Sequence, residues 1–118
     1  MDTDRTTYAP CIFFEYDDSP GTFCLMLTDG EMIKVADLFE AAGYEPNGYM
    51  WNGLAHHLVD TRGIDATDVG FDPEAGMFVA YGKNEASLRA LGEALRDLFH
   101  DRDALAAMLA EVDLYEWD

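Results

Sequence analysis

The chain has 118 residues, 24 of them acidic and 7 basic, which gives a formal net charge of −17 at pH 7. Its hydrophobic fraction of 49%, with 7 Phe, 6 Tyr and 2 Trp, argues against a disordered acidic chain, and its length fits one domain. A surface with this charge repels nucleic acid and anionic lipid. We therefore expect no nucleic-acid or membrane partner. The excess of acids indicates either a solubilising surface or one that is matched to a basic partner.

The N-terminal segment lacks the features of a signal peptide. Residues 1–7 are polar and charged, and the apolar run over residues 11–14 is too short for the hydrophobic region of a signal. No apolar run approaches the length that a membrane span needs. We therefore expect the protein to be cytoplasmic, with Cys11 and Cys24 as free, buried thiols.

A first β-hairpin is predicted after a lead-in over residues 1–10. Residues 11–16 and 22–27 are apolar and aromatic runs of strand length, and the Asp-Asp-Ser-Pro-Gly segment between them is typical of a loop. If the hairpin pairs Phe14 with Cys24, then Cys11 and Cys24 point to opposite faces of the sheet. In that register the two cysteines cannot form a disulfide.

The segment over residues 28–31 (Thr-Asp-Gly-Glu) fits two structures. Its Thr-x-x-Glu spacing is that of a capping box, which would start a helix at once. Alternatively, its Asp-Gly pair forms a tight turn into a third short strand over residues 32–35. In both cases residues 35–42 are predicted to be helical, and Gly43 is placed to cap the end of that helix.

A loop rich in glycine and aromatic residues is predicted over residues 43–51. Such a loop either packs back over the core as a lid or presents a binding surface. A helix follows, which ends near Arg62-Gly63 and carries one apolar stripe at the spacing i, i+3, i+4, i+7. The stripe consists of Trp51, Leu54, Ala55 and Leu58. Residues 65–68 form a polar connection to the next strand.

The second hairpin is the strongest local signal in the sequence. Residues 69–71 and 77–81 alternate as strands do, and the Asp-Pro-Glu-Ala-Gly segment between them has the residues of a turn. The second of these runs is apolar on both faces. We therefore predict that residues 77–81 form a buried central strand.

Two helices are predicted in the C-terminal third. Asn84 is placed as the N-cap of the first, and residues 101–103 separate it from the second. Their apolar stripes consist of Leu88, Leu91, Leu95, Leu98 and Phe99, and of Leu105, Met108, Leu109 and Val112. Residues 113–118 alternate acidic and apolar side chains, and form either an edge strand or a docked terminus.

The predicted order is therefore β-β-α-α-β-β-α-α in a single domain over residues 1–118. We expect an α+β fold, in which a small antiparallel sheet built from two hairpins has three to four helices packed on it. Residues 101–118 make up an acidic C-terminal helix and tail.

The sequence carries no pattern typical of a catalytic or metal site. His56 and His57 are neighbours on a helix and point about 100° apart, so they cannot bind one metal ion together. Five acids follow no calcium-loop or paired-carboxylate spacing. They are Asp60, Asp65, Asp68, Asp72 and Glu74. Nucleophile and phosphate-loop motifs are absent, so the residues favour a small acidic binding protein over an enzyme.

Two stretches of the chain resemble a known family. They are Gly43-Tyr44-x-x-Asn47-Gly48-Tyr49-x-Trp51 and Phe71-Asp72-Pro73-Glu74-x-Gly76-Met77-Phe78-x-Ala80-Tyr81. With the spacing between them and the helix after the second, residues 13–99 resemble the immunity protein 51 family of bacterial polymorphic toxin systems. The resemblance implies a cytoplasmic antidote that binds and neutralises a toxin domain, without catalysis and without a cofactor.

Most positions of these two motifs are glycine, aromatic and turn residues, which we interpret as determinants of the fold and not as the toxin-binding face. They are Gly43, Gly48, Trp51, Phe71, Asp72, Pro73, Gly76, Phe78 and Tyr81.

The net charge and the aromatic residues suggest how such an antidote would bind. We expect an acidic, aromatic-containing face that meets a basic toxin, with long-range attraction steering the encounter. A nuclease is one toxin class that fits. The protein is expected to be a monomer or a weak dimer. The candidate toxin-binding residues are Tyr44, Glu45, Tyr49, Asp113, Tyr115, Glu116 and Trp117.

Two other functions are left open by the residues. A small hydrolase or ligand-binding domain would use the acids between Asp60 and Glu74 together with His56 or His57, and it would need a pocket. A structural acidic domain within a larger cytoplasmic complex would need neither a pocket nor a toxin.

Overall fold

The computed structural model describes residues 3–117 of the chain, and the side chains of residues 3–116. Its hairpins are β1 (Ile12–Glu15) with β2 (Phe23–Thr28), and β3 (Val69–Phe71) with β4 (Met77–Gly82). Its helical segments are α1 (Asp29–Met32), η1 (Ile33–Val35), α2 (Ala36–Ala41), α3 (Gly48–Arg62), α4 (Glu85–His100), α5 (Arg102–Glu111) and η2 (Leu114–Trp117). The predicted α+β fold is confirmed. None of the described helices is long and apolar enough to cross a membrane.

The strands form one antiparallel sheet in the order β1-β2-β4-β3. Phe14 faces Cys24 across β1 and β2, which is the register that separates the two cysteines, and both thiols are free and buried. The prediction that residues 77–81 form a central strand is confirmed, because β4 lies between β2 and β3.

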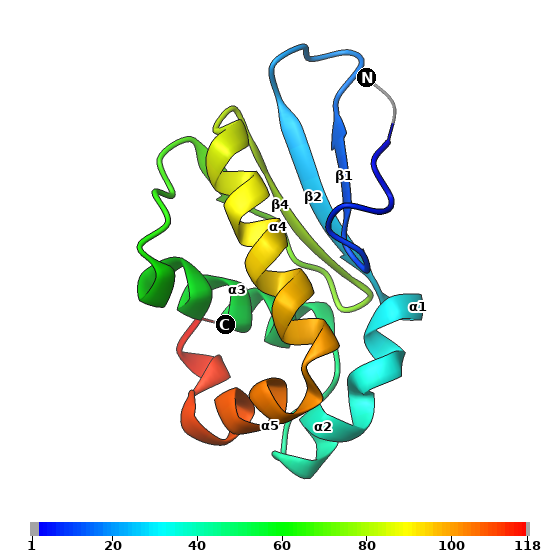
Figure 1. The fold of residues 1–118 in the computed structure, drawn as a ribbon, viewed down its shortest axis with the longest axis vertical. Coiled ribbons are helices and arrows are strands. Elements are labelled where there is room, and N and C mark those ends of the chain that lie inside the picture. Colours follow the sequence, from blue (N-terminus) through cyan, green and yellow to red (C-terminus); the bar gives the residue numbers. More distant parts are fainter. Residues whose placement is uncertain (1–2, 118) are drawn as a thin grey trace.

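Helices cover one face of this sheet (Figure 1). α4 runs across β2 and β4 on that face, and α3, α5 and α2 lie below it. The register places Phe13, Leu25 and Ala80 side by side on the covered face, and each is fully buried. The leucines of α4 recur every three to four residues and therefore face one way, onto this row.

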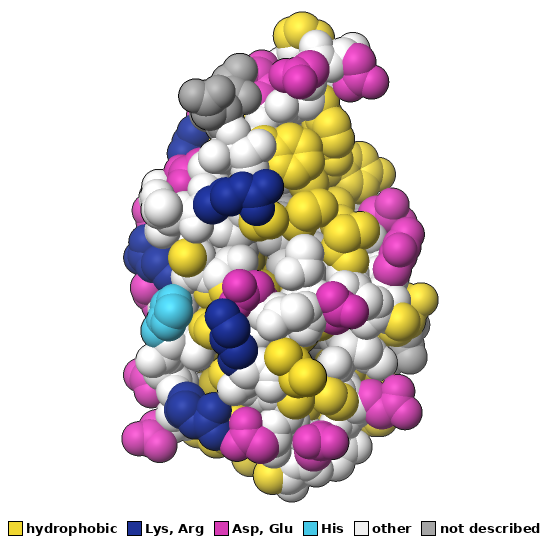
Figure 2. Space-filling model, turned by 90° about the vertical axis from the view of Figure 1, so that its right-hand side faces the viewer, with side chains coloured by type: hydrophobic (Ala, Val, Ile, Leu, Met, Phe, Trp, Pro, Cys, Tyr) yellow, Lys and Arg dark blue, Asp and Glu magenta, His cyan; other side chains and the backbone are white. Residues whose placement is uncertain are grey.

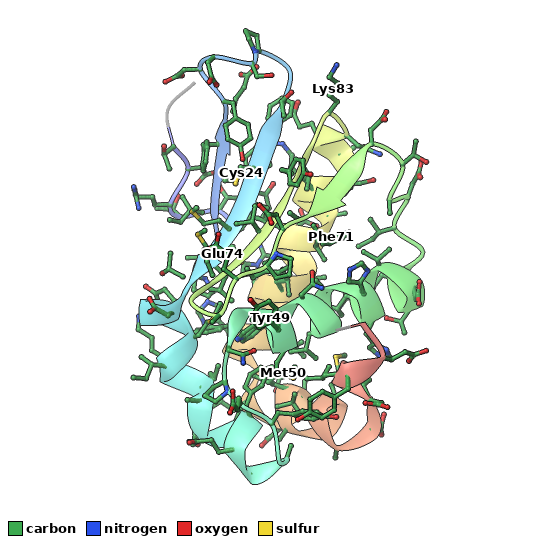
Figure 3. The ribbon with its side chains drawn as sticks, turned by 180° about the vertical axis from the view of Figure 1, so that it is seen from behind. Cys24, Tyr49, Met50, Phe71, Glu74 and Lys83 are labelled. Carbon is green, nitrogen blue, oxygen red and sulfur yellow. The ribbon has the colours of Figure 1, made fainter. Side chains whose placement is uncertain are left out.

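The opposite face of the sheet carries no helix among the described residues (Figure 3). Strand alternation turns Phe14, Cys24 and Tyr81 to this side, next to one another. Cys24 is 1% exposed beneath its neighbours, whereas Tyr81 is 41% exposed. The prediction of a buried strand therefore holds for residues 78–80, but not for Tyr81 near the end of β4. The strand is central in the sheet, but helices cover only one of its faces.

Helix boundaries follow local capping residues. The Asn47 side-chain oxygen accepts a hydrogen bond from Met50 N at 3.0 Å, and Gly63 ends α3 with φ of 63°. The predicted loop before α3 is therefore too long at its C-terminal end, because a capping asparagine starts the helix within the glycine-rich stretch. Asn84 caps α4 in the same way, as expected, and Asp101, in the segment predicted to separate the last two helices, caps α5.

Both segments with two possible structures prove to be helical. The chain after Thr28 forms α1 and not a third strand, although Thr28 makes no side-chain cap bond. The C-terminal segment docks as η2 and not as an edge strand, with Leu114 1% exposed. Leu114 packs on Gly53 of α3, where an added Cβ would lie 2.9 Å from the Leu114 carbonyl oxygen.

The lead-in to β1 packs on the sheet. Asp4 forms an isolated β-bridge with Phe13, and the Tyr8 ring, 3% exposed, lies against Phe13. Gly92 of α4 makes room for this ring, since a Cβ there would come within 2.9 Å of it. Although this segment is mostly polar, its Tyr8 side chain is part of the hydrophobic core.

The closest approach of α3 to the β3–β4 turn identifies a sensitive position. Gly48 N donates to Ala75 O at 2.9 Å, and a Cβ on Gly48 would overlap the backbone carbonyls of Glu74 and Met77. Gly48→Ala should lower the free energy of unfolding by about 1–3 kcal/mol or more, as overpacking does, measured by urea denaturation. Gly30→Ala is the matched control, because nothing lies within 4 Å of a Cβ there. Equal effects of the two substitutions would contradict the contact.

Candidate functional site

The loop between α2 and α3 lies against the C-terminal turn η2, and Tyr44 holds them together. Its hydroxyl donates to Val112 O at 2.8 Å and accepts from Leu114 N at 3.3 Å. Its ring lies 5.4 Å from the Tyr115 ring, tilted by 49°. Gly43 has φ of 89°, which lets the chain leave α2 immediately before Tyr44. One hydroxyl thus joins two segments that are far apart in sequence.

A hollow of about 290 Å³ opens beside this contact, and we call it the aromatic hollow. It is lined by Glu45, Asn47, Tyr49, Met50 and Tyr115. Tyr49 and Tyr115 are 40% and 57% exposed, so aromatic surface is accessible to a partner here. Figure 3 shows Tyr49 and Met50 at the start of α3, near the β3–β4 turn that carries Glu74.

A second hollow, of about 430 Å³, lies between α3 and the end of α5, and we call it the acidic hollow. Its lining residues are His57, Asp60, Glu111, Val112, Asp113 and Glu116. Four of these six are acids, so this surface is anionic. The Asp113 carboxylate also accepts a hydrogen bond from Tyr115 N at 3.1 Å. Through that bond η2 connects the two hollows.

The ion pairs among the described side chains lie outside both hollows. They join Lys34 to Glu31, Arg89 to Glu85, Arg96 to Asp97, and Arg102 to Asp37. The carboxylates of the two hollows are therefore available to cationic groups of a partner, for which charge-assisted hydrogen bonds are the strongest polar contacts.

The structure brings together six of the seven residues that the sequence singled out for partner binding. They are Tyr44, Glu45, Tyr49, Asp113, Tyr115 and Glu116. The seventh, Trp117, has a side chain outside the described residues. Sequence reasoning missed Asn47, Met50, Glu111 and Val112 as lining residues, and named His57 and Asp60 only for the hydrolase alternative. The signal for the first two was present, since an asparagine that caps a helix places the next residues on its first turn.

His56 and His57 have different surroundings. The His56 ring lies 4.2 Å from the Phe71 ring, and burial lowers the pKa of His56, with the Asp60 charge acting in the opposite direction. His57 lines the acidic hollow with Asp60, but the other acids of the 60–74 segment do not. Asp65, for instance, accepts from the backbone of its own turn. The residues of the hydrolase alternative are therefore not gathered in one hollow.

Within residues 3–117, no three His, Cys, Asp or Glu side chains are grouped so that they could hold a metal ion. The acidic hollow is thus a surface of spread carboxylates, suited to contacting several cationic side chains.

The sequence model of the family described as immunity protein 51 matches residues 11–114. This range contains both hairpins and every helix from α1 to α5. The chain belongs to the immunity protein 51 family. The resemblance carried by the glycine–aromatic and Asp-Pro-Glu stretches is thereby confirmed. No curated protein and no solved structure matches the chain significantly.

Within this immunity protein 51 domain, the motif residues pack around the start of α3. The Trp51 side chain is fully buried, with its ring 5.2 Å from Phe39 and 6.2 Å from Phe99. The Phe71 and Phe78 rings lie 6.4 Å apart on the β3–β4 hairpin. The Trp51 contacts fix α3 against α2 and α4, and so hold Tyr49 at the rim of the aromatic hollow.

The dual hydrogen bond of Tyr44 predicts a local effect on the C-terminal turn. Tyr44→Phe leaves Val112 O and Leu114 N without this partner, and should lower the free energy of unfolding by about 1 kcal/mol. Amide exchange at Leu114 should accelerate more than exchange in β4, as measured by NMR. Tyr49→Phe, on an exposed ring, is the control. Unchanged exchange at Leu114 would show that the hydroxyl does not hold η2.

The environment of His56 predicts a pH dependence of stability. Because burial lowers the pKa of folded His56 below 6.5, the unfolded chain takes up the proton first as the pH falls. The contribution of neutral His56 is therefore present above pH ~6.5 and is lost as the pH falls through the folded pKa. The stability difference between wild type and His56→Gln should shrink from about pH 7.5 to about pH 5 in urea denaturation. A constant difference would contradict this.

Proposed function

We propose that this protein is a cytoplasmic immunity protein that binds and neutralises a cognate bacterial toxin domain, one that is secreted or delivered by contact. The observation that carries the proposal is the family match over residues 11–114. The protein acts by occlusion: it covers surface that the toxin needs, and it catalyses no reaction.

The toxin-binding surface is proposed to be the pair of hollows around η2. Tyr49 and Tyr115 supply exposed aromatic area, which is the type of side chain that contributes most at interface centres. The acids of the acidic hollow supply a charged rim, as protein interfaces usually have. The net charge of −17 extends the attraction beyond direct contact.

A basic toxin domain is the partner that this charge fits. Nucleases are one such class, because they bind phosphate through cationic surface, and carboxylates such as those of Glu111 and Glu116 would occupy part of it. The free protein is proposed to be a monomer or a weak dimer, since two copies of this charge repel each other.

Co-expression with the toxin domain encoded immediately upstream of this gene tests the proposal. Cells should survive only when both are expressed, and the two proteins should elute as one complex. Death of the cells together with separate elution would overturn the proposal. A toxin domain inactivated by substitution allows the complex to be measured without selection.

Electrostatic steering predicts the salt dependence of association with that inactive toxin domain. The Debye length falls from about 10 Å at 0.1 M salt to about 3 Å at 1 M. The association rate constant should therefore fall at least about tenfold over this range in stopped-flow measurements, with a smaller change in the dissociation rate. A rate that stays flat would remove steering from the proposal and leave occlusion intact.

The aromatic hollow makes its own prediction. Tyr49→Ala with Tyr115→Ala should weaken the Kd by about tenfold to a hundredfold, the range expected when exposed aromatic anchors are truncated. Ile33→Ala is the matched control, because Ile33 is 72% exposed on η1 and lines neither hollow. Equal Kd values for the two variants would show that the aromatic hollow does not contact the toxin.

A further inference from the structure

The uncovered face of the sheet is apolar from β1 to β4. Pairing aligns Phe14, Cys24 and Tyr81 in one row and Ile12, Met26 and Val79 in the next. Tyr16 continues the face beyond the first row, with its ring 5.3 Å from the Phe14 ring. We call this surface the sheet-face patch. It consists of the partly exposed Ile12, Phe14, Tyr16 and Met26 and the exposed Tyr81, over the buried Cys24 and Val79.

Figure 2 shows this surface obliquely, as hydrophobic side chains gathered toward the upper right. Its side chains pack on one another. The Tyr81 ring lies across β3 over Gly70, where an added Cβ would come within 2.6 Å of a ring carbon. Burial is the main cause that raises the pKa of Tyr16 to about 12, and the neighbouring Cys24 thiol acts in the same direction. The patch is thus a closed layer of side chains, with Tyr81 still 41% exposed.

Such a face is unusual for an antiparallel sheet with helices on one side only. Strands of this kind normally alternate apolar and polar residues, so that the open face is polar. Here the outward positions of β1, β2 and β4 are apolar as well. Three strands about 4.8 Å apart make the patch roughly 10 Å wide. Apolar surface gathered in one place and rimmed by polar residues is typical of interaction sites when it is part of a larger interface.

Acidic side chains surround the sheet-face patch. They are Asp17, Asp18, Asp29, Asp68, Asp72 and Glu74, all of them exposed, at the loops and strand ends that border the sheet. The bases near it are Lys83 after β4 and Arg5 near β1. A second copy of the chain would place its own acids against the acids of this rim, and the two sets would repel each other. The rim therefore fits an occupant whose own apolar contact is ringed by Lys and Arg.

We infer that the sheet-face patch is a docking surface for the cationic toxin domain. The inference rests on the proposed function, and it adds the sheet-face patch to the toxin-binding surface proposed around η2. The β3–β4 turn joins the patch to the aromatic hollow, since Gly48 at the start of α3 is bonded to Ala75 of that turn. A patch about 10 Å by 15 Å covers only ~150 Å², whereas a standard interface buries ~800 Å² per partner. The patch is the apolar centre, and the rim and the aromatic hollow extend it.

The test uses the full chain and the inactivated toxin domain encoded immediately upstream, with the Kd measured by calorimetry. Tyr81→Lys and Met26→Lys each place a positive charge in the patch and should weaken the Kd at least about 30-fold, the loss expected at an interface centre. Tyr81→Glu should weaken it less than Tyr81→Lys, because the new charge attracts the bases of the toxin. Ala106→Lys, at an exposed position of α5, is the matched control.

A measurement on the wild-type chain covers the case in which a variant does not fold. Oxidative footprinting should show Met26 and Tyr81 protected when the toxin domain is bound, and Ala106→Lys should keep the wild-type Kd within about twofold. Circular dichroism and thermal unfolding identify any variant that has lost its structure.

Each outcome bears on one conclusion. Folded Lys variants with wild-type Kd, and no protection of Met26, would overturn the inference and leave the proposed function standing. A wild-type chain that neither protects cells nor binds the toxin domain would overturn both. A dimer seen by light scattering and abolished by Tyr81→Lys would assign the patch to a second copy, which also overturns the inference.

Discussion

The pairing of β2 with β4 is the constraint on which the rest of the structure depends. It joins two hairpins that α1, α2 and α3 separate in the chain, and it aligns residues across all four strands. One set of residues, including Leu25 and Ala80, then meets α4, and the alternate set faces outward. Because the backbone hydrogen bonds fix the register, core and open face are determined together.

The candidate site depends on a second constraint, the close approach of backbones to α3. Gly48 admits the β3–β4 turn and Gly53 admits η2, each at a distance that a Cβ would prevent. The helix therefore serves as a platform with the sheet at its start and the C-terminal turn along its side. Tyr49 lies beside the contact of α3 with the β3–β4 turn, and Tyr115 lies on η2. The Tyr44 hydroxyl holds η2 in place through its hydrogen bond to Val112 O.

The features that could be predicted from the sequence are local. The turn at residues 72–76, the cap residues Asn84 and Asp101, and the leucine stripe of α4 each act within a few positions of the chain. The hydrogen bond from Tyr44 to Val112 joins residues 68 positions apart, so no local sequence pattern predicts it. The membership of both hollows follows from such contacts and was predicted only in part, from aromatic residues and acids.

The exposure of Tyr81 on β4 has a specific physical cause. A strand that is apolar on both sides has the same pattern whether its second face is covered by a helix or is left open. Tyr81 distinguishes the two cases only through its exposure, which depends on there being no helix over that face in the described structure. The acidic character of the surface was already evident from composition, because charged side chains are almost never fully buried.

Alternation along the strands also bears on how this protein can diverge. Phe13 lies in the core while its neighbours Ile12 and Phe14 face outward, and the same holds for Leu25 beside Met26. Replacing an outward side chain therefore alters the surface with little effect on the core on the other side of the sheet, and such changes add independently only at positions that do not contact each other. If this face binds a toxin whose sequence changes, the immunity protein can change its binding surface one residue at a time and keep the same fold. Gly70 is the exception, because any side chain there displaces the ring of Tyr81.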